Sequence, residues 1–578
     1  MAAAADSVAA MRRNHGIALT AALLAACALP GFAAAGQNLY VGNSQGNSVS
    51  AFGITTSNGL LTPLAGSPFA SGDAARGVVL TPDGTHLYVT STSDNNVHGY
   101  VVAPSGALTP LPGSPYATGP GPQTLALNPA GTTLYVANTG ASSISAFSVA
   151  ADGSLGVLAG SPFATGGTPT GIAVAPDGSH VYVASFATDS IRTHQVVTTA
   201  GGLGPPLTTP AGGNVWNVRP TPDGTRLYAS NLGDATLSGY AIAGDGTLTG
   251  LPGSPYPTGA APEGIAITPD GTKLYNANVN DSTISAFSIA DGGALTAIPG
   301  GPFAGGVDTA AALAVTADGR RLYAGNLGND TVAGFNIAAG GALGAQIGSP
   351  YAGVDGPDNT SVVVSPDQGP TAAFTAKTAK NGTVKFNGSA STDPTGSIAR
   401  YSWDFADGQT ASSGGTTPNH QYAESGRYEA TLMVTDDAGC STERTFNGQM
   451  AMCNGGPQAL ATVKVKADTE VKRPQLKGKG KQEQKGGKIL VKLKAGAKED
   501  VKVKAKGKIT ADDREYNLKK VRKSVAGGKR KTLKLKLKKP GDASAVRRAL
   551  GRAKARVTVT FTDDAGNRAT KKKTVRLK

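Results

Sequence analysis

The sequence predicts an all-β protein in which a closed seven-bladed β-propeller precedes two small β-sandwich domains. Three observations predict this fold: a tyrosine-bearing repeat with a period near 47 residues, two complementary half-units at the ends of that repeat, and alternating apolar and polar positions beyond it. The 578 residues include 79 glycines and 35 prolines, a turn-rich composition that suits many short strands. A chain of this length needs more than one core.

The repeat is marked by a tyrosine in the strand that follows a turn such as Pro-Asp-Gly. Proline fixes φ in this turn, and glycine accepts a positive φ. Seven tyrosines, spaced by 46 to 48 residues, carry the repeat: Tyr40, Tyr88, Tyr135, Tyr182, Tyr228, Tyr275 and Tyr323. A period of this length with several short β runs is typical of a four-stranded propeller blade.

The two ends of the repeat complement each other. The strand "NLYVGN" at Asn38 has no Pro-Asp turn before it, and the last turn, Pro366-Asp367, has no tyrosine strand after it. We therefore expect the N-terminal strands to pair with the C-terminal innermost strand. The pairing would complete seven blades and leave no exposed sheet edge.

The repeat "TPDGTHLYVTST", from Thr81, and its copies resemble the seven-bladed propeller lactonase family and the related YVTN surface-layer repeats. The resemblance covers about residues 36–368. It implies a propeller fold and, as an activity, lactone hydrolysis of the 6-phosphogluconolactonase type. Family members often begin the innermost strand with Pro-Arg-His, placing arginine six residues and histidine five residues before the turn proline.

This register can be read off each blade of the present sequence. The arginine positions hold Arg76, Gln123, Thr170, Trp216, Glu263, Ala311 and Thr360. The histidine positions hold Gly77, Thr124, Gly171, Asn217, Gly264, Ala312 and Ser361. Only Arg76 matches the family's arginine, and none of these positions matches its histidine. His86 and His180 follow turns and are expected to face solvent, and His194 to be a packing residue.

Arg76 and Glu263 are the candidate catalytic residues at the channel, and Trp216 is a candidate stacking surface for a ligand. Lactone hydrolysis needs a proton-transferring group and a cation that stabilises the oxyanion. Alternatively, the three side chains only hydrate the channel mouth. The sequence has no metal-ligand spacing, phosphate loop or Ser-His-Asp arrangement, so we expect no metal and no cofactor.

The N-terminus predicts export. Arg12 and Arg13 precede an apolar stretch over 17–29 and the small residues at 33–35, which suggests a signal peptide over residues 1–35, with Met11 as an alternative start. A lipobox-like alternative, "LAAC", would place a lipid on Cys27. No later run is long enough to span a membrane, so the mature chain is expected to be secreted and associated with the cell surface.

The segment after the propeller, residues 369–466, resembles a PKD domain, an Ig-like sandwich. Its "WDFADG" carries Ala406 in place of a glycine of the family's Trp-Asp-Phe-Gly-Asp-Gly turn. Trp403 is expected to anchor the core, and the carboxylates of Asp393, Asp404 and Asp407 to cap turns rather than bind a cation. In an oxidising compartment, Cys440 and Cys453 should form a disulfide. The resemblance implies contacts with proteins or polysaccharides and no catalytic residues.

The last segment, residues 467–578, is strongly basic. From Lys466 onward there are 38 Lys and Arg against 11 Asp and Glu, a net charge of +27, whereas the rest of the chain has −12. Stretches such as "DVKVKAKGKI" alternate apolar and basic residues and predict half-buried strands. "SAVRRALGRAKA" suggests one short helix. The closing "TDDAGN" resembles the end of bacterial Ig-like domains, which implies a β-sandwich, and we expect this sandwich to have one cationic face.

Three interpretations of that face remain open. In the first it only keeps the domain soluble, in the second it binds an anionic wall polymer or lipid headgroups, and in the third it binds nucleic acid. The scarcity of aromatic side chains for base stacking disfavours nucleic acid. Taken together, the sequence suggests an exported cell-surface binding or adhesion protein that uses the propeller and the PKD domain as scaffolds for polysaccharide or protein ligands. The alternative is a lactone hydrolase.

Overall fold

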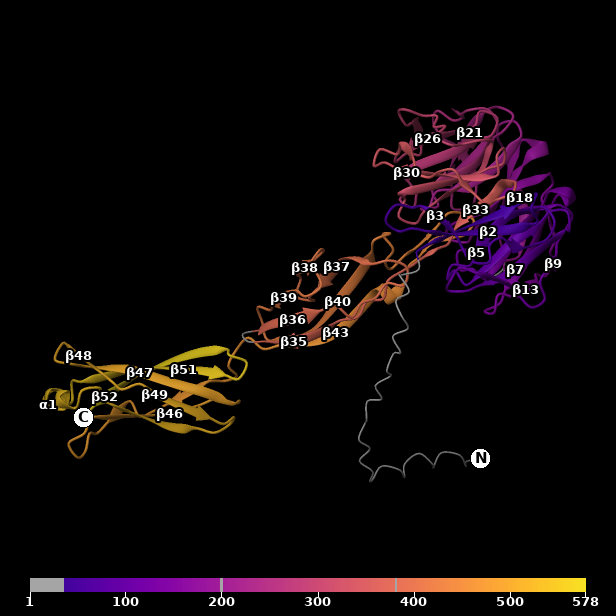
Figure 1. Cartoon of the computed structure of the whole chain (residues 1–578). Coiled ribbons are helices and arrows are strands. Elements are labelled where there is room, and N and C mark those ends of the chain that lie inside the picture. Colours follow the sequence, from indigo (N-terminus) through magenta and orange to yellow (C-terminus); the bar gives the residue numbers. More distant parts are fainter. Residues whose placement is uncertain (1–35, 198–200, 380–381) are drawn as a thin grey trace, which may run out of the picture.

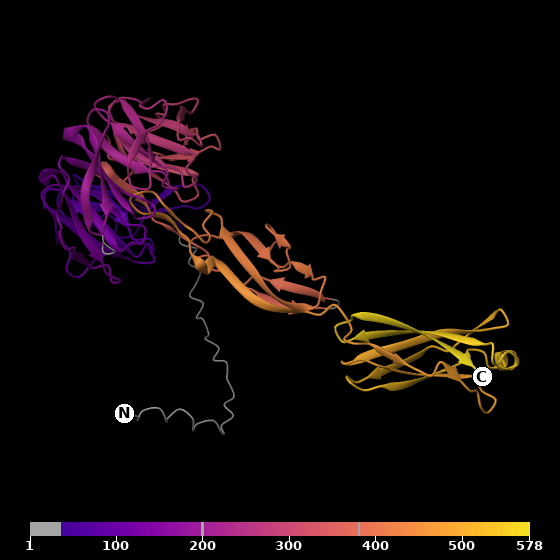
Figure 2. The ribbon, with the colours of Figure 1, turned by 180° about the vertical axis from the view of Figure 1, so that it is seen from behind.

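The computed structural model describes residues 36–197, 201–379 and 382–578. Three all-β domains follow one another in a row, with the propeller at one end and the lysine-rich domain at the other (Figure 1, Figure 2). The predicted signal peptide and Cys27 lie outside the described residues.

The first domain is a ring of seven blades, each a sheet whose strands follow one another outward in antiparallel order. The innermost strands are β5 (Ala75–Leu80), β10 (Pro122–Leu127), β15 (Pro169–Val174), β19 (Val215–Pro220), β24 (Pro262–Ile267), β28 (Ala310–Val315) and β33 (Pro357–Val364). The second strands are β1 (Asn38–Asn43), β6 (His86–Ser91), β11 (Thr133–Asn138), β16 (His180–Ser185), β20 (Arg226–Asn231), β25 (Lys273–Asn278) and β29 (Arg321–Asn326).

The ring closes as the sequence predicts. Strand β1, from the N-terminal end, pairs antiparallel with β33, with Leu39 opposite Val364 and Tyr40 opposite Val363. One blade is therefore assembled from both ends of the repeat, and its innermost strand has a hydrogen-bonded neighbour like those of the other six. Prediction of a seven-bladed, all-β ring is confirmed.

The repeat tyrosines join neighbouring blades. In six blades the buried tyrosine hydroxyl donates to a glycine carbonyl about 65 residues further along the ring, over 2.6 to 2.9 Å. The acceptors are Gly106, Gly153, Gly201, Gly293, Gly341 and Gly59. The hydroxyl of Tyr182 is the exception, because it has no partner among the described residues.

Because Tyr182 lacks this hydrogen bond, it provides a matched control for the contribution of the tyrosine hydroxyls to stability. Tyr275→Phe should lower the free energy of unfolding by about 1–2 kcal/mol, because it leaves the buried carbonyl of Gly341 without its donor. Tyr182→Phe, which removes a hydroxyl without a partner, should cost less than about 0.5 kcal/mol. Urea unfolding of the propeller gives the free energy of unfolding of each variant. Equal decreases in the two variants would show that the hydrogen bond does not account for the stability these tyrosines contribute.

The second domain is a sandwich of two sheets. One contains β35 (Thr375–Thr378), β36 (Thr383–Asn387) and β39 (Asn419–Gln421), and the other β38 (Thr410–Ala411), β37 (Ile398–Asp404), β40 (Gly426–Asp436) and β43 (Leu460–Ala467). Trp403 is buried between them and packs edge-on against Phe374, with ring centroids 5.1 Å apart. The predicted core anchor is confirmed.

A hairpin of the second domain leaves the sandwich and enters the propeller. It consists of β41 (Arg444–Phe446) and β42 (Ala451–Asn454), and we call residues 444–454 the plug hairpin. At its tip, the backbone N–H groups of Leu127 and Val174 donate to the carbonyls of Gln449 (2.8 Å) and Gly448 (2.7 Å). Phe446, Met450 and Met452 each pack into a different propeller core cluster. The plug hairpin therefore fills one end of the central channel.

The third domain is also a sandwich. A sheet of β44 (Gln475–Lys477), β46 (Leu490–Gly496) and β50 (Lys531–Lys536) packs on a sheet of β45 (Lys481–Gln482), β52 (Arg568–Leu577), β51 (Lys554–Asp563), β47 (Val501–Ala511) and β48 (Arg514–Asn517), with β49 (Val521–Val525) also on β47. The predicted short helix is α1 (Ala543–Arg548). Apolar side chains on alternate positions of β47 and β51 form the core. Both outer faces carry exposed lysines, so the expectation of a single cationic face was wrong.

Candidate active site at the channel mouth

Each innermost strand is entered through a similar backbone turn. In six of the seven blades the residue before the strand has a left-handed φ, between 51° and 66°: Ala74, Gly121, Asn214, Ala261, Thr309 and Gly356. The common turn places the second residue of each innermost strand at the same level of the ring. These residues are Arg76, Gln123, Thr170, Trp216, Glu263, Ala311 and Asp358.

Asp358 replaces the residue that the sequence register predicts for the seventh blade. The register counted back from Pro366 selects Thr360 and Ser361, but β33 has eight residues whereas the other six innermost strands have six. Its pairing with β1 shifts between Val41 and Asn43, as a β-bulge does. The prediction for this blade was therefore wrong by two residues, and it missed an acid at the mouth.

The structure brings the predicted charges together around this missed acid. The guanidinium Nη2 of Arg76 lies 3.3 Å from the Oδ2 of Asp358. The Oε2 of Glu263 is buried and has no hydrogen-bond partner among the described residues. Burial, and next the carboxylate of Asp358, raise the pKa of Glu263 to about 8, while Arg76 and Trp216 act in the opposite direction. Glu263 can therefore exchange a proton near neutral pH.

An aromatic surface borders the charged groups. Trp216 meets Phe186 edge-on, with ring centroids 5.6 Å apart and an interplanar angle of 78°. The side chain of Gln123 is held by Thr139, whose hydroxyl donates to its Oε1 over 2.8 Å. The mouth thus combines a protonatable carboxyl, a cation, an amide and an aromatic surface. This combination suits a small polar ring with a carbonyl group.

At the glycine positions of the histidine register, close packing leaves no room for a side chain. A Cβ added to Gly171 would lie 2.7 Å from the Cα of Asn217, and one added to Gly264 would lie 2.5 Å from the carbonyl oxygen of Ala311. These positions face the backbone of the neighbouring innermost strand and not open space. In these blades, close contact with the neighbouring strand takes the place of the family's histidine.

His180 lies on the second strand of its blade, and His194 lies on the third. His194 is buried on β17 (Ser190–Val196), as expected for a packing residue, and burial lowers its pKa. His180, however, is only 4 % exposed, so the expectation that it faces solvent was wrong. Its ring packs beside Gly246 of the next blade, which covers it.

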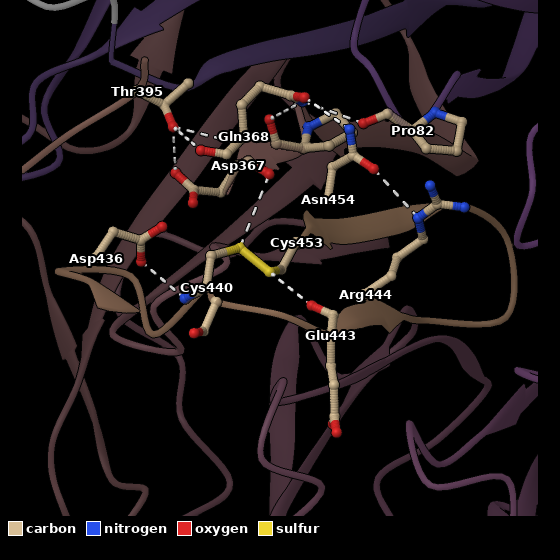
Figure 3. The surroundings of a disulfide bond; sticks show 12 residues. Pro82, Asp367, Gln368, Thr395, Asp436, Cys440, Glu443, Arg444, Cys453 and Asn454 are labelled. Atoms are coloured by element: carbon tan, nitrogen blue, oxygen red, sulfur yellow. Dashed lines mark hydrogen bonds between the residues drawn. A yellow bond between two sulfur atoms is a disulfide. The ribbon is translucent and has the colours of Figure 1, made fainter. Parts of the chain in front are cut away.

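The plug hairpin closes the channel at the end opposite the mouth and is fastened by a disulfide. Cys440 and Cys453 are bonded at its base (Figure 3). Gln368 donates through Nε2 to the carbonyl of Pro82 over 3.1 Å, and Arg444 donates to the carbonyl of Pro129. Both acceptors belong to Pro-Asp-Gly-type turns, so the second domain holds that end of the ring.

The disulfide should stabilise this closure. Replacing both cysteines by serine should lower the free energy of unfolding by about 3 kcal/mol, the value typical of a closed loop of this length. Melting curves of the variant and of the oxidised parent provide the measurement, and reduction of the parent should reproduce the shift. If neither the substitutions nor reduction of the parent changed the melting temperature, the disulfide would not stabilise the protein.

Two buried carboxyls lie beside the disulfide. Oxygens of Asp367 and Asp436 are within 4.8 Å of each other, and each residue has one oxygen without a partner in the described chain. Burial raises the pKa of both groups. The charge of Asp436 raises the pKa of Asp367 further, whereas the hydrogen bond with Asp367 lowers that of Asp436. Cys440 completes a potential metal-binding trio with them, but its sulfur is already bonded to Cys453.

Asp393, Asp404 and Asp407 cap turns, as predicted. Asp393 accepts from the backbone N–H of Thr395, and Asp404 from that of Ala406, which has a φ of +60°. Asp407 accepts from Gln409 and also pairs with His420 over 2.7 Å.

Comparisons with known proteins agree with this architecture. Residues 104–354 match the family model "Lactonase, 7-bladed beta-propeller", and residues 367–450 match the model "PKD domain". The chain carries a lactonase-type propeller followed by a PKD domain. The lactonase-type propeller resembles a candidate 6-phosphogluconolactonase from Bacteroides fragilis, at 20% identity and a TM-score of 0.50, over 58% of this chain and 99% of that one.

The periplasmic gluconolactonase PpgL of Pseudomonas aeruginosa gives the same values of 20% and 0.50, over 57% of this chain and 99% of its own. At this identity, both likenesses show the fold alone. The curated relatives match short regions. A microbial collagenase of Vibrio alginolyticus is 41% identical over 72 residues, and the pre-pro-metalloprotease PrtV of Vibrio cholerae is 35% identical over 101.

The chain spans about a tenth of the length of these curated relatives. Within the ranges that the structure covers, no helix combines the length and apolarity of a membrane span.

Proposed function

We propose that this protein hydrolyses a lactone at the channel mouth of its propeller and that it acts outside the cytoplasm. The observation that carries the proposal is Glu263, a buried carboxyl with a pKa near 8, beside the Arg76–Asp358 pair. The match to the lactonase family supports the reaction class. The disulfide and the PKD domain support an extracellular location.

The proposed chemistry follows from these groups. Ionised Glu263 takes a proton from a water molecule that attacks the lactone carbonyl carbon, and Arg76 stabilises the oxyanion that forms. The tetrahedral intermediate collapses by breaking the ring C–O bond, and Glu263 returns the proton to the departing alkoxide. Asp358 holds the guanidinium in place, and Trp216 packs against the ring.

The test is turnover of a panel of sugar lactones, including 6-phosphogluconolactone, by the purified protein. Acid release is recorded above the spontaneous rate for the parent and for Arg76→Met. We expect the variant to lose about 100-fold or more in kcat/KM, as loss of an oxyanion donor does. Arg320→Met, an exposed arginine just after the turn glycine Gly319, is the matched control and should keep full activity. A parent without turnover on any lactone contradicts the proposal.

Binding without turnover is the second candidate, favoured by the single arginine and the missing histidine of the family register. In that case the mouth would take a polysaccharide or protein ligand of the cell envelope, with Trp216 as the stacking surface. Trp216→Ala would then abolish capture of a sugar ligand, while no ligand would be consumed. Mass spectrometry of the recovered ligand separates this candidate from hydrolysis.

We also propose that the third domain retains the protein on an anionic wall polymer. The outer face of the larger sheet carries exposed cations on neighbouring strands: Lys502, Lys504, Lys506, Lys508, Arg522, Lys554, Arg556, Arg568, Lys572 and Arg576. Among them, Lys508 pairs with Glu515 over 2.6 Å. The smaller sheet presents half as many: Lys477, Lys492, Lys494, Lys534 and Lys536. The rows suit a linear polymer of phosphate or carboxylate repeats.

Two charge-matched variants test this retention. Changing the lysines at 502, 504, 506 and 508 to glutamine should weaken binding to purified wall polymer and reduce its salt dependence, because each neutralised anion contributes to the slope. Changing those at 492, 494, 534 and 536 should have less than half that effect. Equal losses in both variants would contradict a specific face. Equal binding to anionic lipid vesicles would identify headgroups, not the polymer, as the partner.

A further inference from the structure

A small cavity lies inside the channel, next to the tip of the plug hairpin. Its volume is about 40 Å³, which is more than one water molecule needs. Aliphatic side chains of β24, β28 and β33 form much of its wall, and Arg219, Asn447 and Gln449 also line it. Two domains therefore contribute to one internal space, and the catalytic groups proposed above are not among its lining residues.

Arg219 is a buried cation without a counter-charge. It is 5 % exposed, and its guanidinium donates to two neutral carbonyls, that of Ile265 through Nε (3.2 Å) and that of Asn447 through Nη1 (3.1 Å). No carboxylate of the described residues forms an ion pair with it. Burial alone lowers its pKa to about 10, with no acid opposing the shift, so the group is charged at physiological pH. A buried charge of this kind is strongly unfavourable unless something compensates it.

Gln449 supplies an independent sign of a missing partner. It is 5 % exposed, and its amide Nε2 is buried without a hydrogen-bond acceptor among the described residues. The backbone prevents the residue from turning away, because the Gln449 carbonyl accepts from Leu127 and its N–H donates to the Oδ1 of Asn447 over 2.9 Å. Buried donors without acceptors are rare in native proteins.

We propose that this cavity binds one small monovalent anion of halide size, held between the guanidinium of Arg219 and the amide of Gln449. The anion would neutralise the one group and accept from the other. Chloride is the abundant ion of this size in extracellular fluids. None of the groups proposed to act on the lactone lines this cavity, so its occupant is distinct from the proposed lactone and its product.

The proposed ion would connect the two domains. Arg219 lies on β19 of the propeller, and Gln449 lies at the tip of the plug hairpin. An anion bound by both residues would help to hold the plug hairpin against the propeller. Without it, a cation and a hydrogen-bond donor are left unsatisfied at the interface. Binding should therefore stabilise the folded protein by mass action.

The experiment measures melting temperature against sodium chloride, with sodium methanesulfonate keeping the ionic strength constant. We expect a rise of about 3–5 °C on going to 100 mM chloride, and a similar rise with bromide. In Arg219→Met the rise should disappear, whereas Arg320→Met should keep it. A parent protein without chloride dependence, or an Arg219→Met variant that retains it, overturns the proposal.

A second variant covers the case in which Arg219→Met fails to fold. Gln449→Glu places a fixed carboxylate in the cavity, so the chloride dependence should vanish while the protein remains folded in methanesulfonate alone. Unchanged chloride dependence in Gln449→Glu would count against the site. Crystals grown in sodium bromide should show one anomalous peak beside Arg219, and its absence in a bromide-saturated crystal also refutes the assignment.

Discussion

Glu263→Gln should lower kcat for lactone hydrolysis by about 100-fold or more, because it removes the group proposed to take the proton from water. The substitution keeps the size of the side chain, and the neutral amide places no charge in the buried site. The melting temperature should therefore stay within a few degrees of the parent or rise. Steady-state rates and melting curves on the same preparation separate lost chemistry from lost folding.

The pH dependence gives this prediction a sharper form. Since the pKa of Glu263 is raised to about 8, the ionised base accumulates only as the pH approaches that value, and the rate should rise from pH 6 to pH 8. Asp358→Asn removes a negative neighbour and should move the midpoint to lower pH. Arg76→Met should move it to higher pH. A midpoint that neither variant shifts would exclude Glu263 as the titrating base.

Stability should fall as the pH rises above about 4, owing to Asp367 and Asp436. Both carboxyls have pKa values raised by burial, so the folded protein holds protons that the unfolded chain releases near its ordinary value of 3.8. The unfolding free energy therefore decreases with pH, by up to about 1.4 kcal/mol per pH unit for each proton held. Thermal unfolding between pH 4 and pH 9, with EDTA present, measures this slope.

Asp367→Asn isolates the contribution of the pair. The amide cannot ionise, so the part of the slope that Asp367 contributes should disappear above pH 4, and the variant should be more stable than the parent at pH 9. Asp404→Asn, which alters a turn cap on the same domain, should keep the parent slope. A slope that persists in Asp367→Asn would place the titrating groups elsewhere.

Much of the propeller could be predicted because its information is local and repeated. Six of the seven tyrosine strands follow a turn of the Pro-Asp-Gly type, whose residues act within a short stretch of chain, as where Asp83 accepts from the hydroxyl of Thr81 and Gly84 has a φ of +69°. Counting back from these turns located Arg76, Trp216 and Glu263. The same count failed for Asp358, because a bulge in β33 adds two residues that no local signal marks.

The plug hairpin could not be predicted in the same way. Its segment resembles an ordinary loop of the PKD domain. The two cysteines predict a disulfide, but they do not indicate that the bonded hairpin enters the propeller. Arg219 and Asn447 are 228 residues apart in the chain, and only the folded protein brings them into contact. The burial of His180 is similar, because it depends on a turn of the next blade.

The sequence by itself determined the closed ring of seven blades, the sandwich that follows and the basic character of the last domain, because these depend on short-range periodicity and composition. The tertiary structure alone decided which charges meet at the mouth, what closes the channel and where, among the described residues, a cation is buried without a counter-charge. Those properties depend on a strand bulge and on contacts between distant segments, and side-chain alternation within a strand carries no information about either.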